Sequence, residues 1–167
     1  ASGNFFVDAY YETYKLNVIT TSCSNNYGPH QHREKLIPTI VRTAIAGKNI
    51  PIYGNGDNVR DWLFVEDHCV AIDEVFHNGK IGEIYNVGGN KELNNLELAN
   101  KICDILDELK PKKTKYSKQL TFVEDRKGHD FRYAVDFSKI HNELNWNPTS
   151  DFEGKLRETI KWCMANS

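Results

Sequence analysis

The sequence predicts an α/β fold. Segments with apolar residues at helical spacing alternate along the chain with short apolar runs, and each run ends in a polar or glycine-containing turn. This alternation is typical of α/β proteins. The chain has 167 residues, of which 40% are hydrophobic and 26% charged, so it is long enough to bury a core and is expected to form one compact unit.

The charge balance and the termini exclude several classes of protein. The net charge is -2, so no general attraction to nucleic acid or to an anionic membrane surface is expected. No apolar run is long enough to span a bilayer, and the first residues lack the pattern of a signal peptide. We therefore expect a cytoplasmic protein.

The first expected elements are a helix and a buried strand. Large apolar residues recur at helical spacing between Phe5 and Tyr14, and residues 16–21 form a short apolar run. The run ends in the polar sequence SCSNNYGP, which predicts a turn. Because open α/β sheets bind ligands beyond the carboxyl ends of their strands, Ser24, Asn25 and Asn26 are candidate ligand contacts, and a turn rich in asparagine explains them equally well.

The next segment predicts a helix, an edge strand and a turn. Pro38 suits the first turn of a helix whose apolar face continues to Ile45, and Gly47 follows as a stop. Residues 50–53 alternate like a short edge strand. The glycine turn at 54–57 lacks the third glycine of a dinucleotide fingerprint, so we interpret it as a plain turn.

Two helices and one strand are expected in the middle of the chain. Residues 67–76 carry a helical apolar stripe, and residues 84–87 form a short strand closed by two glycines. Asn94 is expected to cap the following helix, with Glu97 in the capping-box position.

The last third predicts a loop, a strand and two helices. A nucleic-acid site would need interleaved aromatic residues and a larger basic surface than the run at 110–118 offers, so we interpret this run as a solvated loop. Residues 120–123 follow as a strand. Asp136 is expected to cap a short helix. Ser150 and Glu153 predict a capping box for the final helix.

Two charged segments are candidate binding sites. Arg60 follows the glycine turn, where its guanidinium could clamp a phosphate, and an ion pair with Asp57 or Asp61 is the alternative. The segment DRKGHDFRY gathers many charges around a glycine, which fits a ligand site and a structural ion-pair network equally well. The four cysteines are scattered among apolar neighbours, so reduced buried thiols and no metal site are expected.

Six segments resemble one family. The chain contains, in this order, SNNYGP, EKLIP, PIYGNGDNVRDWLFVEDH, YNVGG, DRKGHDFRYA, and LNWNP followed by DFEGKLRETIKW. They are similar to the dTDP-glucose 4,6-dehydratases of the extended short-chain dehydrogenase/reductase family, over essentially the whole chain. YNVGG is shared with epimerases and decarboxylases that act on UDP-sugars, whereas EKLIP, RDWL and RxGHDxR point to the 4,6-dehydratases.

The resemblance implies an NAD-dependent lyase. The family oxidises C4 of the glucose of dTDP-glucose, eliminates water across C5 and C6, and returns the hydride to C6, giving dTDP-4-keto-6-deoxyglucose. Its catalytic Tyr-x-x-x-Lys lies on a helix that continues with residues similar to Ala1, Ser2 and Gly3. The chain is therefore expected to be the carboxy-terminal half of an extended Rossmann-type enzyme and to be inactive alone, because the catalytic residues and the glycine-rich NAD fingerprint lie upstream.

The resemblance also implies two structural parts and a partner. Residues 1–30 correspond to the last helix and strand of the dinucleotide-binding domain, and residues 31–167 to a small mixed α/β substrate-binding domain with some segments returning to the Rossmann-type domain. A homodimer through the first helix is expected, because its large apolar side chains are too many to leave in water. A non-catalytic module that binds a nucleotide-sugar is the alternative from another class.

Carried over position by position, the resemblance implies contacts with the dTDP-sugar and with NAD. Asn26 is expected to contact the NAD end, and Tyr53 is suited to stack on the thymine. Lys127 stands where the family usually has proline, which removes a fixed φ from that turn. The expected substrate-binding residues are Asn25, Lys35, Leu36, Pro51, Ile52, Tyr53, Arg60, Asn95, Asp125, Arg126, Lys127, Gly128 and His129.

Overall fold

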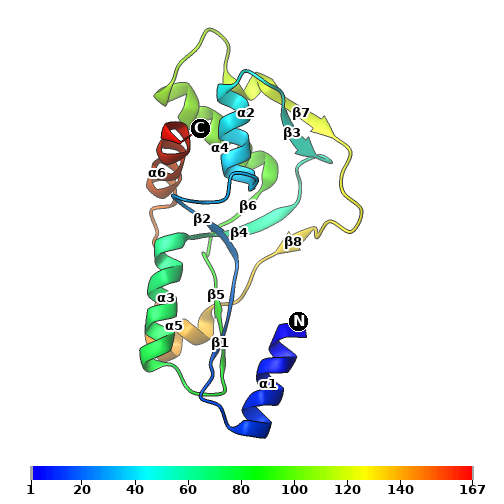
Figure 1. The fold of residues 1–167 in the computed structure, drawn as a ribbon. Coiled ribbons are helices and arrows are strands. Elements are labelled where there is room, and N and C mark those ends of the chain that lie inside the picture. The colour runs from blue at the N-terminus through cyan, green and yellow to red at the C-terminus, as the bar shows by residue number, and fades with distance from the viewer. Residues whose placement is uncertain (1, 167) are drawn as a thin grey trace.

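The structure, a computed structural model, describes residues 2–166 and is elongated (Figure 1). Helices and strands alternate along the chain, and most of the strand pairs are parallel. The predicted α/β fold class is therefore confirmed. Ala1, the first of the residues on which the predicted starting point depends, lies outside the described residues.

One end of the molecule is built on a pair of parallel strands. β1 (Thr20–Cys23) pairs with β5 (Ile84–Val87), and Thr20 lies opposite Ile84. The helices α3 (Val65–Asn78) and α5 (Ser138–Leu144) pack beside these strands (Figure 1). Apolar side chains of these elements form the smaller of two cores, which includes Leu63, Ala71, Val75, Tyr85, Val87, Ile140 and Trp146.

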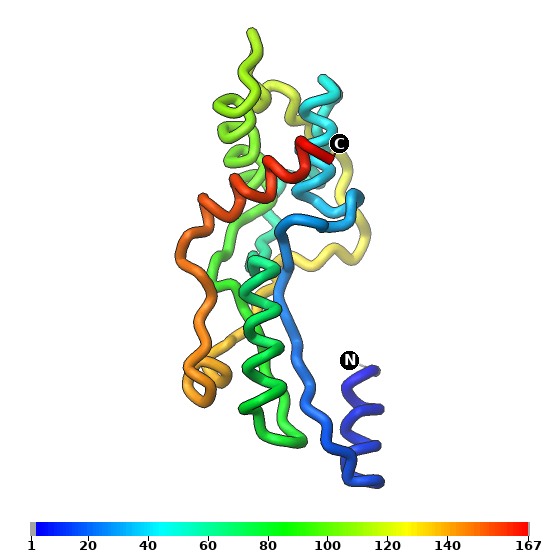
Figure 2. The backbone as a smooth tube through the Cα atoms, turned by 60° about the vertical axis from the view of Figure 1, so that its left-hand side comes forward, coloured from blue at the N-terminus to red at the C-terminus, as the bar shows by residue number. Residues whose placement is uncertain are grey.

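The first helix, α1 (Ser2–Tyr14), lies apart from the other helices in both views of the backbone (Figure 1 and Figure 2). Its large side chains are in solvent: Phe5 is 73% exposed, Phe6 70% and Tyr14 65%. The helix therefore presents an apolar surface that the described part of the chain does not cover.

The other end of the molecule packs three helices against a second parallel pair. The helices are α2 (Leu36–Ile45), α4 (Asn95–Leu109) and α6 (Phe152–Ala165). The strands are β3 (Ile50–Tyr53) and β7 (Leu120–Val123), and a short 3-10 helix, η1 (Tyr116–Gln119), directly precedes β7 in the chain. Figure 2 shows α6 crossing beside α2 and α4. Their apolar faces, together with Tyr27 and Trp62, form the larger core.

One strand, β4 (Val59–Phe64), connects the two ends. Three short strands pair with it: β2 (Asn25–Tyr27) and β8 (Arg132–Tyr133) in parallel, and β6 (Glu92–Asn94) antiparallel. Side chains alternate across a strand, so Trp62 and Phe64 enter the larger core while Leu63 enters the smaller one. Both cores are formed largely by residues after position 30. The predicted division of the chain near residue 30 stays a prediction.

Asp61 ties β4 to the glycine turn after β5. Its side chain is buried, and its two carboxylate oxygens accept hydrogen bonds from the backbone N–H of Gly89, at 2.7 Å, and of Lys91, at 2.8 Å. A buried carboxylate is costly unless such donors satisfy it, so the turn and the strand hold each other in place.

Elements with local signals are where the sequence predicts them. The helices that were expected around residues 5–14, 38–45 and 67–76 are present, as are the strands at 50–53, 84–87 and 120–123. The capping box of α4 is complete: the Asn94 side chain accepts from Glu97 N at 2.8 Å, and the Glu97 side chain accepts from Asn94 N at 2.9 Å.

Other predictions about the fold are wrong. The first strand begins only at Thr20, and SCSNNYGP is not a turn, because Ser24 alone separates β1 from β2. Strand β4 was not predicted, since two charged residues interrupt its apolar pattern. The final helix is capped by Asp151, whose side chain accepts from Gly154 N at 2.9 Å, and not by Ser150.

The short helix α5 and the cysteines also differ from expectation. The N-cap residue is Phe137, although Asp136 accepts from Ser138 N at 2.8 Å and so still satisfies the first turn. Cys69 is exposed, so not all four thiols are buried.

None of the helices within residues 2–166 combines the length and the apolar character needed to cross a bilayer.

Candidate functional site

A cleft of about 420 Å³ opens beside β4, between β3, the start of α2 and the loop at 125–130. It brings together most of the residues that the resemblance implies for substrate binding, and it adds others that were not expected. The expected ones are Asn25, Lys35, Leu36, Pro51, Tyr53, Arg60, Asn95, Arg126 and His129, and the additional ones are Glu34, Thr39, Ile40 and Trp62.

Four of the expected residues do not line this cleft. Ile52 is 2% exposed and lies in the larger core, because side chains alternate along β3 and only Pro51 and Tyr53 face outward. Lys127 and Gly128 lie exposed at the tip of the loop. Asp125 does not line the cleft but forms hydrogen bonds with Arg126 and His129, which do.

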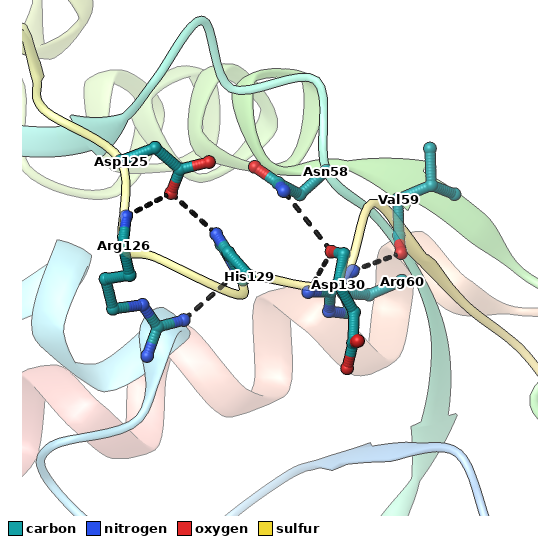
Figure 3. Close-up of polar contacts among 7 residues, drawn as sticks. All are labelled: Asn58, Val59, Arg60, Asp125, Arg126, His129 and Asp130. Atoms are coloured by element: carbon teal, nitrogen blue, oxygen red, sulfur yellow. Dashed lines mark hydrogen bonds and ion pairs between the residues drawn. The ribbon is translucent and has the colours of Figure 1, made fainter.

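Arg60 projects from β4 toward the loop at 125–130 (Figure 3). Its guanidinium donates to two backbone carbonyls, from Nη1 to Val59 O at 2.7 Å and from Nη2 to Asp130 O at 2.8 Å. Among the described residues no carboxylate forms an ion pair with it, and Asp61 accepts from backbone N–H groups instead. The alternative of an ion pair with Asp57 or Asp61 is therefore wrong, and the Arg60 guanidinium at the cleft pairs with no carboxylate of residues 2–166.

The loop that faces Arg60 is an internal network of charges (Figure 3). Asp125 Oδ1 accepts from Arg126 N at 2.8 Å and contacts His129 Nδ1 at 2.7 Å, while Arg126 Nη2 lies 3.0 Å from His129 Nε2. A guanidinium only donates, so Nε2 accepts and the imidazole proton lies on Nδ1, which donates to Asp125. This hydrogen bond from His129 is the largest cause that holds the pKa of Asp125 below its usual value.

The charges of this loop fit both explanations given for them, a structural ion-pair network and a ligand site. It is an ion-pair network, and it also places Arg126 and His129 in the wall of the cleft. Gly128 has a φ of +72°, a left-handed conformation that lets the backbone turn back so that His129 N reaches Arg126 O at 3.2 Å. Lys127, which replaces the expected proline, is exposed at this turn.

Tyr53 supplies the aromatic surface of the cleft. Its side chain is 38% exposed, the Arg126 guanidinium carbon lies 5.3 Å from the ring centroid, and the His129 ring meets it edge-on at 6.5 Å. An exposed aromatic ring beside a guanidinium can bind a flat, electron-rich group that is attached to an anion.

A second cleft, of about 370 Å³, continues from the first. The two share Asn25, Lys35, Leu36 and Trp62, and the second adds Asn26, Gln31 and His32. Arg60 and Arg126 line only the first cleft and Lys35 lines both, so the second cleft holds fewer cations and more neutral amides.

Asn26 is held firmly inside the second cleft. Its Nδ2 donates to Ser24 O at 3.2 Å and lies 3.3 Å from Cys23 Sγ, and its Oδ1 lies 2.8 Å from His68 Nδ1. Because the Nδ2 end is fixed by a carbonyl, Oδ1 must accept from an N–H at Nδ1 of His68. Burial lowers the pKa of His68 below its usual value. Both ends of the Asn26 amide are thus used within the chain.

The sequence contains one Tyr-x-x-x-Lys spacing that was not predicted to matter, at Tyr11 and Lys15. In the structure the Lys15 ammonium lies 5.6 Å from the Tyr11 ring centroid and pairs with Glu12 at 3.0 Å. Tyr11 lies in the last turn of α1 and Lys15 just after the helix, and neither residue lines either cleft. This pair does not belong to the candidate site.

Comparison with known proteins gives consistent matches. A family model described as GDP-mannose 4,6 dehydratase matches residues 1–159. The dTDP-glucose 4,6-dehydratase of Salmonella typhimurium is 52% identical over 167 residues, which are 100% of this chain and 46% of that protein. The chain spans about half the length of the curated relatives that it matches.

Solved structures share the fold. The dTDP-glucose 4,6-dehydratase of Bacillus anthracis, in complex with NAD, has a TM-score of 0.88 at 49% identity and covers 99% of this chain, which covers 50% of that one. The enzyme of Streptomyces venezuelae, with NAD and TYD bound, has a TM-score of 0.88 at 43% identity, with 98% and 48% covered. The chain therefore has the architecture of one half of such Rossmann-type proteins.

Proposed function

The chain belongs to the GDP-mannose 4,6 dehydratase family, and on that premise we propose that it is the half of a dTDP-glucose 4,6-dehydratase that binds the sugar nucleotide. The observation that carries the proposal is the first cleft, in which the unneutralised Arg60 lies near the exposed ring of Tyr53. A nucleoside diphosphate presents the complementary groups, a flat base and a strong anion. The identity of 52% to a curated enzyme of this activity supports the same substrate.

In this proposal each side of the cleft binds one part of the substrate. Arg60 and Arg126 hold the diphosphate by charge-assisted hydrogen bonds, and Lys35 adds a third cation at the cleft wall. Tyr53 stacks on the thymine, and Asn25 and Asn95 supply neutral amides. The chain thus positions the substrate and lets the loop at 125–130 cover it.

NAD is proposed as the cofactor of the parent enzyme, meaning the full-length protein to which we assign this half. Bound in the parent enzyme, NAD would supply the hydride acceptor and donor of the reaction. The residues of this chain do not fit a complete NAD site, because the turn at 54–57 lacks the third glycine and leads into β4, a strand, instead of a helix. Asn26, the one predicted NAD contact, uses its amide within the chain.

The catalytic steps are therefore assigned to the parent enzyme and not to this chain. We propose that the isolated chain forms no 4-keto sugar from dTDP-glucose. The placement in the carboxy-terminal half stays a prediction, which rests on the absence of G-x-G-x-x-G from the sequence. The complete gene tests it: a fingerprint encoded upstream supports the placement, and one encoded downstream contradicts it.

Calorimetric titration of the chain with dTDP, UDP and GDP tests the proposal. We expect dTDP to bind most tightly, because the cleft recognises the diphosphate and the resemblance assigns the base pocket to thymine. Circular dichroism of the same sample shows that the chain is folded. Failure of a folded chain to bind any of the three contradicts the proposal, and tighter binding of UDP favours an epimerase or decarboxylase that acts on UDP-sugars.

We also propose that the parent enzyme is a homodimer through α1, whose apolar side chains are exposed in this chain. A Phe6→Asp substitution is expected to shift the dimer toward monomer, measured by sedimentation velocity, because it places a charge in an apolar contact. Phe122→Asp is the matched control, since Phe122 is 57% exposed but lies on β7 at the other end. A wild-type enzyme that stays monomeric at high concentration contradicts the proposal.

A further inference from the structure

Trp62 carries a buried donor without an acceptor. Its side chain is 4% exposed, and the indole Nε1 forms no hydrogen bond with any residue that the structure describes. Buried polar groups in proteins are nearly always paired, so such an orphan calls for a partner from outside the chain. Trp62 lines both clefts, so the unpaired N–H belongs to a ring that borders the space a ligand would fill.

Gln31 carries the complementary orphan in the second cleft. Its Nε2 donates to Asn26 O at 2.7 Å, which fixes the orientation of the amide and leaves Oε1 as the other end. That Oε1 is also buried and without a partner among the described residues. The second cleft is therefore bordered by two residues that carry one unused N–H and one unused carbonyl oxygen. A hydroxyl group can satisfy either of them because it both donates and accepts.

The strand geometry sets the distance of Trp62 from the diphosphate site. Alternation along β4 places Arg60 and Trp62 on the same face, and two residues of a strand span about 7 Å. The parallel register places Asn25 directly beside Trp62. Trp62 therefore lies about 7 Å along the strand from a phosphate bound at Arg60, toward the second cleft. This distance matches the size of a hexose with its hydroxyls.

The Trp62 N–H and the Gln31 Oε1 are uncharged, which also favours a sugar as the ligand of the second cleft. The cations Arg60 and Arg126 line the first cleft and favour phosphate oxygens. An indole N–H is uncharged, and the Asn26 amide, which lines the same second cleft, is already hydrogen-bonded at both ends. Hydroxyl and ring oxygens of a sugar are the acceptors that remain.

We propose that Trp62 is a specificity-determining residue, whose indole N–H donates to an oxygen of the hexose and, together with Gln31 Oε1, distinguishes the sugar nucleotide from the bare nucleoside diphosphate. This inference rests on the proposed function of the first cleft. In this proposal Trp62 contacts the sugar, and Arg60 contacts the diphosphate.

The experiment compares dTDP-glucose with dTDP as ligands of the parent enzyme. Trp62→Phe keeps an aromatic ring and removes the N–H, and benzothienylalanine at position 62 replaces the N–H by sulfur without loss of volume. We expect both variants to bind dTDP-glucose about tenfold more weakly while their affinity for dTDP changes less than about twofold, because one neutral hydrogen bond to the sugar is lost. Trp146→Phe is the matched control, since Trp146 is also 4% exposed but lies in the smaller core.

Each result separates the inference from the proposed function. Equal losses for the two ligands in the benzothienylalanine variant overturn the inference, since the ring would then act through packing. Unchanged affinity for dTDP-glucose in that variant overturns it as well. A wild-type enzyme that does not bind dTDP overturns the proposed function, and the inference with it.

Discussion

Replacing Arg60 by alanine is expected to weaken dTDP binding to the parent enzyme by one to two powers of ten, about 2–3 kcal/mol. The guanidinium lies in the cleft without a carboxylate partner and is oriented by Val59 O and Asp130 O. A phosphate therefore gains a charge-assisted contact whose direction is already fixed. Arg60→Lys is expected to recover only part of the loss, because an ammonium cannot reproduce the two parallel hydrogen bonds of the fork. Calorimetric titration with dTDP measures both variants.

Two control variants separate the charge of Arg60 from its contact with the loop. Asn58 is the other side chain that holds Asp130 O, at 3.3 Å, so Asn58→Ala loosens the loop and keeps the charge. Arg157→Ala removes a guanidinium that pairs with Glu108 at the surface, at 2.6 Å, outside both clefts. Both controls are expected to bind dTDP within a few-fold of wild type. An Arg60→Ala variant that melts at a lower temperature but binds dTDP like wild type contradicts the assigned role.

Replacing Gly89 by alanine is expected to destabilise the fold by more than about 4 kcal/mol, which is at the upper end for single substitutions. A Cβ at this position would lie 1.9 Å from the carbonyl oxygen of Trp62 and 2.7 Å from Leu63 N. Both are backbone atoms of β4, so no side-chain rotation relieves the overlap. The turn would have to withdraw, which would break the hydrogen bond from Gly89 N to Asp61 and leave a buried carboxylate short of a donor.

Urea unfolding of the chain, followed by circular dichroism, measures this effect. Gly3→Ala is the matched control, because a Cβ there meets nothing within 4 Å and the position lies in α1. Alanine favours a helix over glycine by up to about 1 kcal/mol, so this control is expected to be neutral or slightly stabilising. A Gly89→Ala variant with the unfolding midpoint of wild type would show that the turn is not packed against β4 as described.

The parts of the fold that follow from local chemistry were predictable from the sequence. The capping box of Asn94 and Glu97 needs only residues three apart, and it is present with both hydrogen bonds. Strand β4 was missed because Asp61 looks like a surface residue until the N–H groups of Gly89 and Lys91, far along the chain, are placed on it. The cap at Asp151 was misplaced by one residue, a shift that sequence spacing cannot resolve.

The candidate site divides in the same way. Family resemblance carried the residues of the first cleft, including Arg60, Tyr53 and His129. The resemblance did not point to Trp62. Its position in the clefts follows from the alternation of side chains along β4, a strand that was not predicted. Ile52 shows the reverse error, because a three-residue motif was assigned whole to the cleft although its middle side chain must point into the core.

The strand pairs that frame the first cleft join distant parts of the chain: Ile50 pairs with Leu120, and Val59 with Arg132. Contacts of this kind give a high contact order, because a long loop must close before either pair forms. The helix α4, by contrast, is stabilised by neighbours in sequence and can form early. A nascent chain therefore cannot form this cleft until the residues of β7 and β8 have been synthesised.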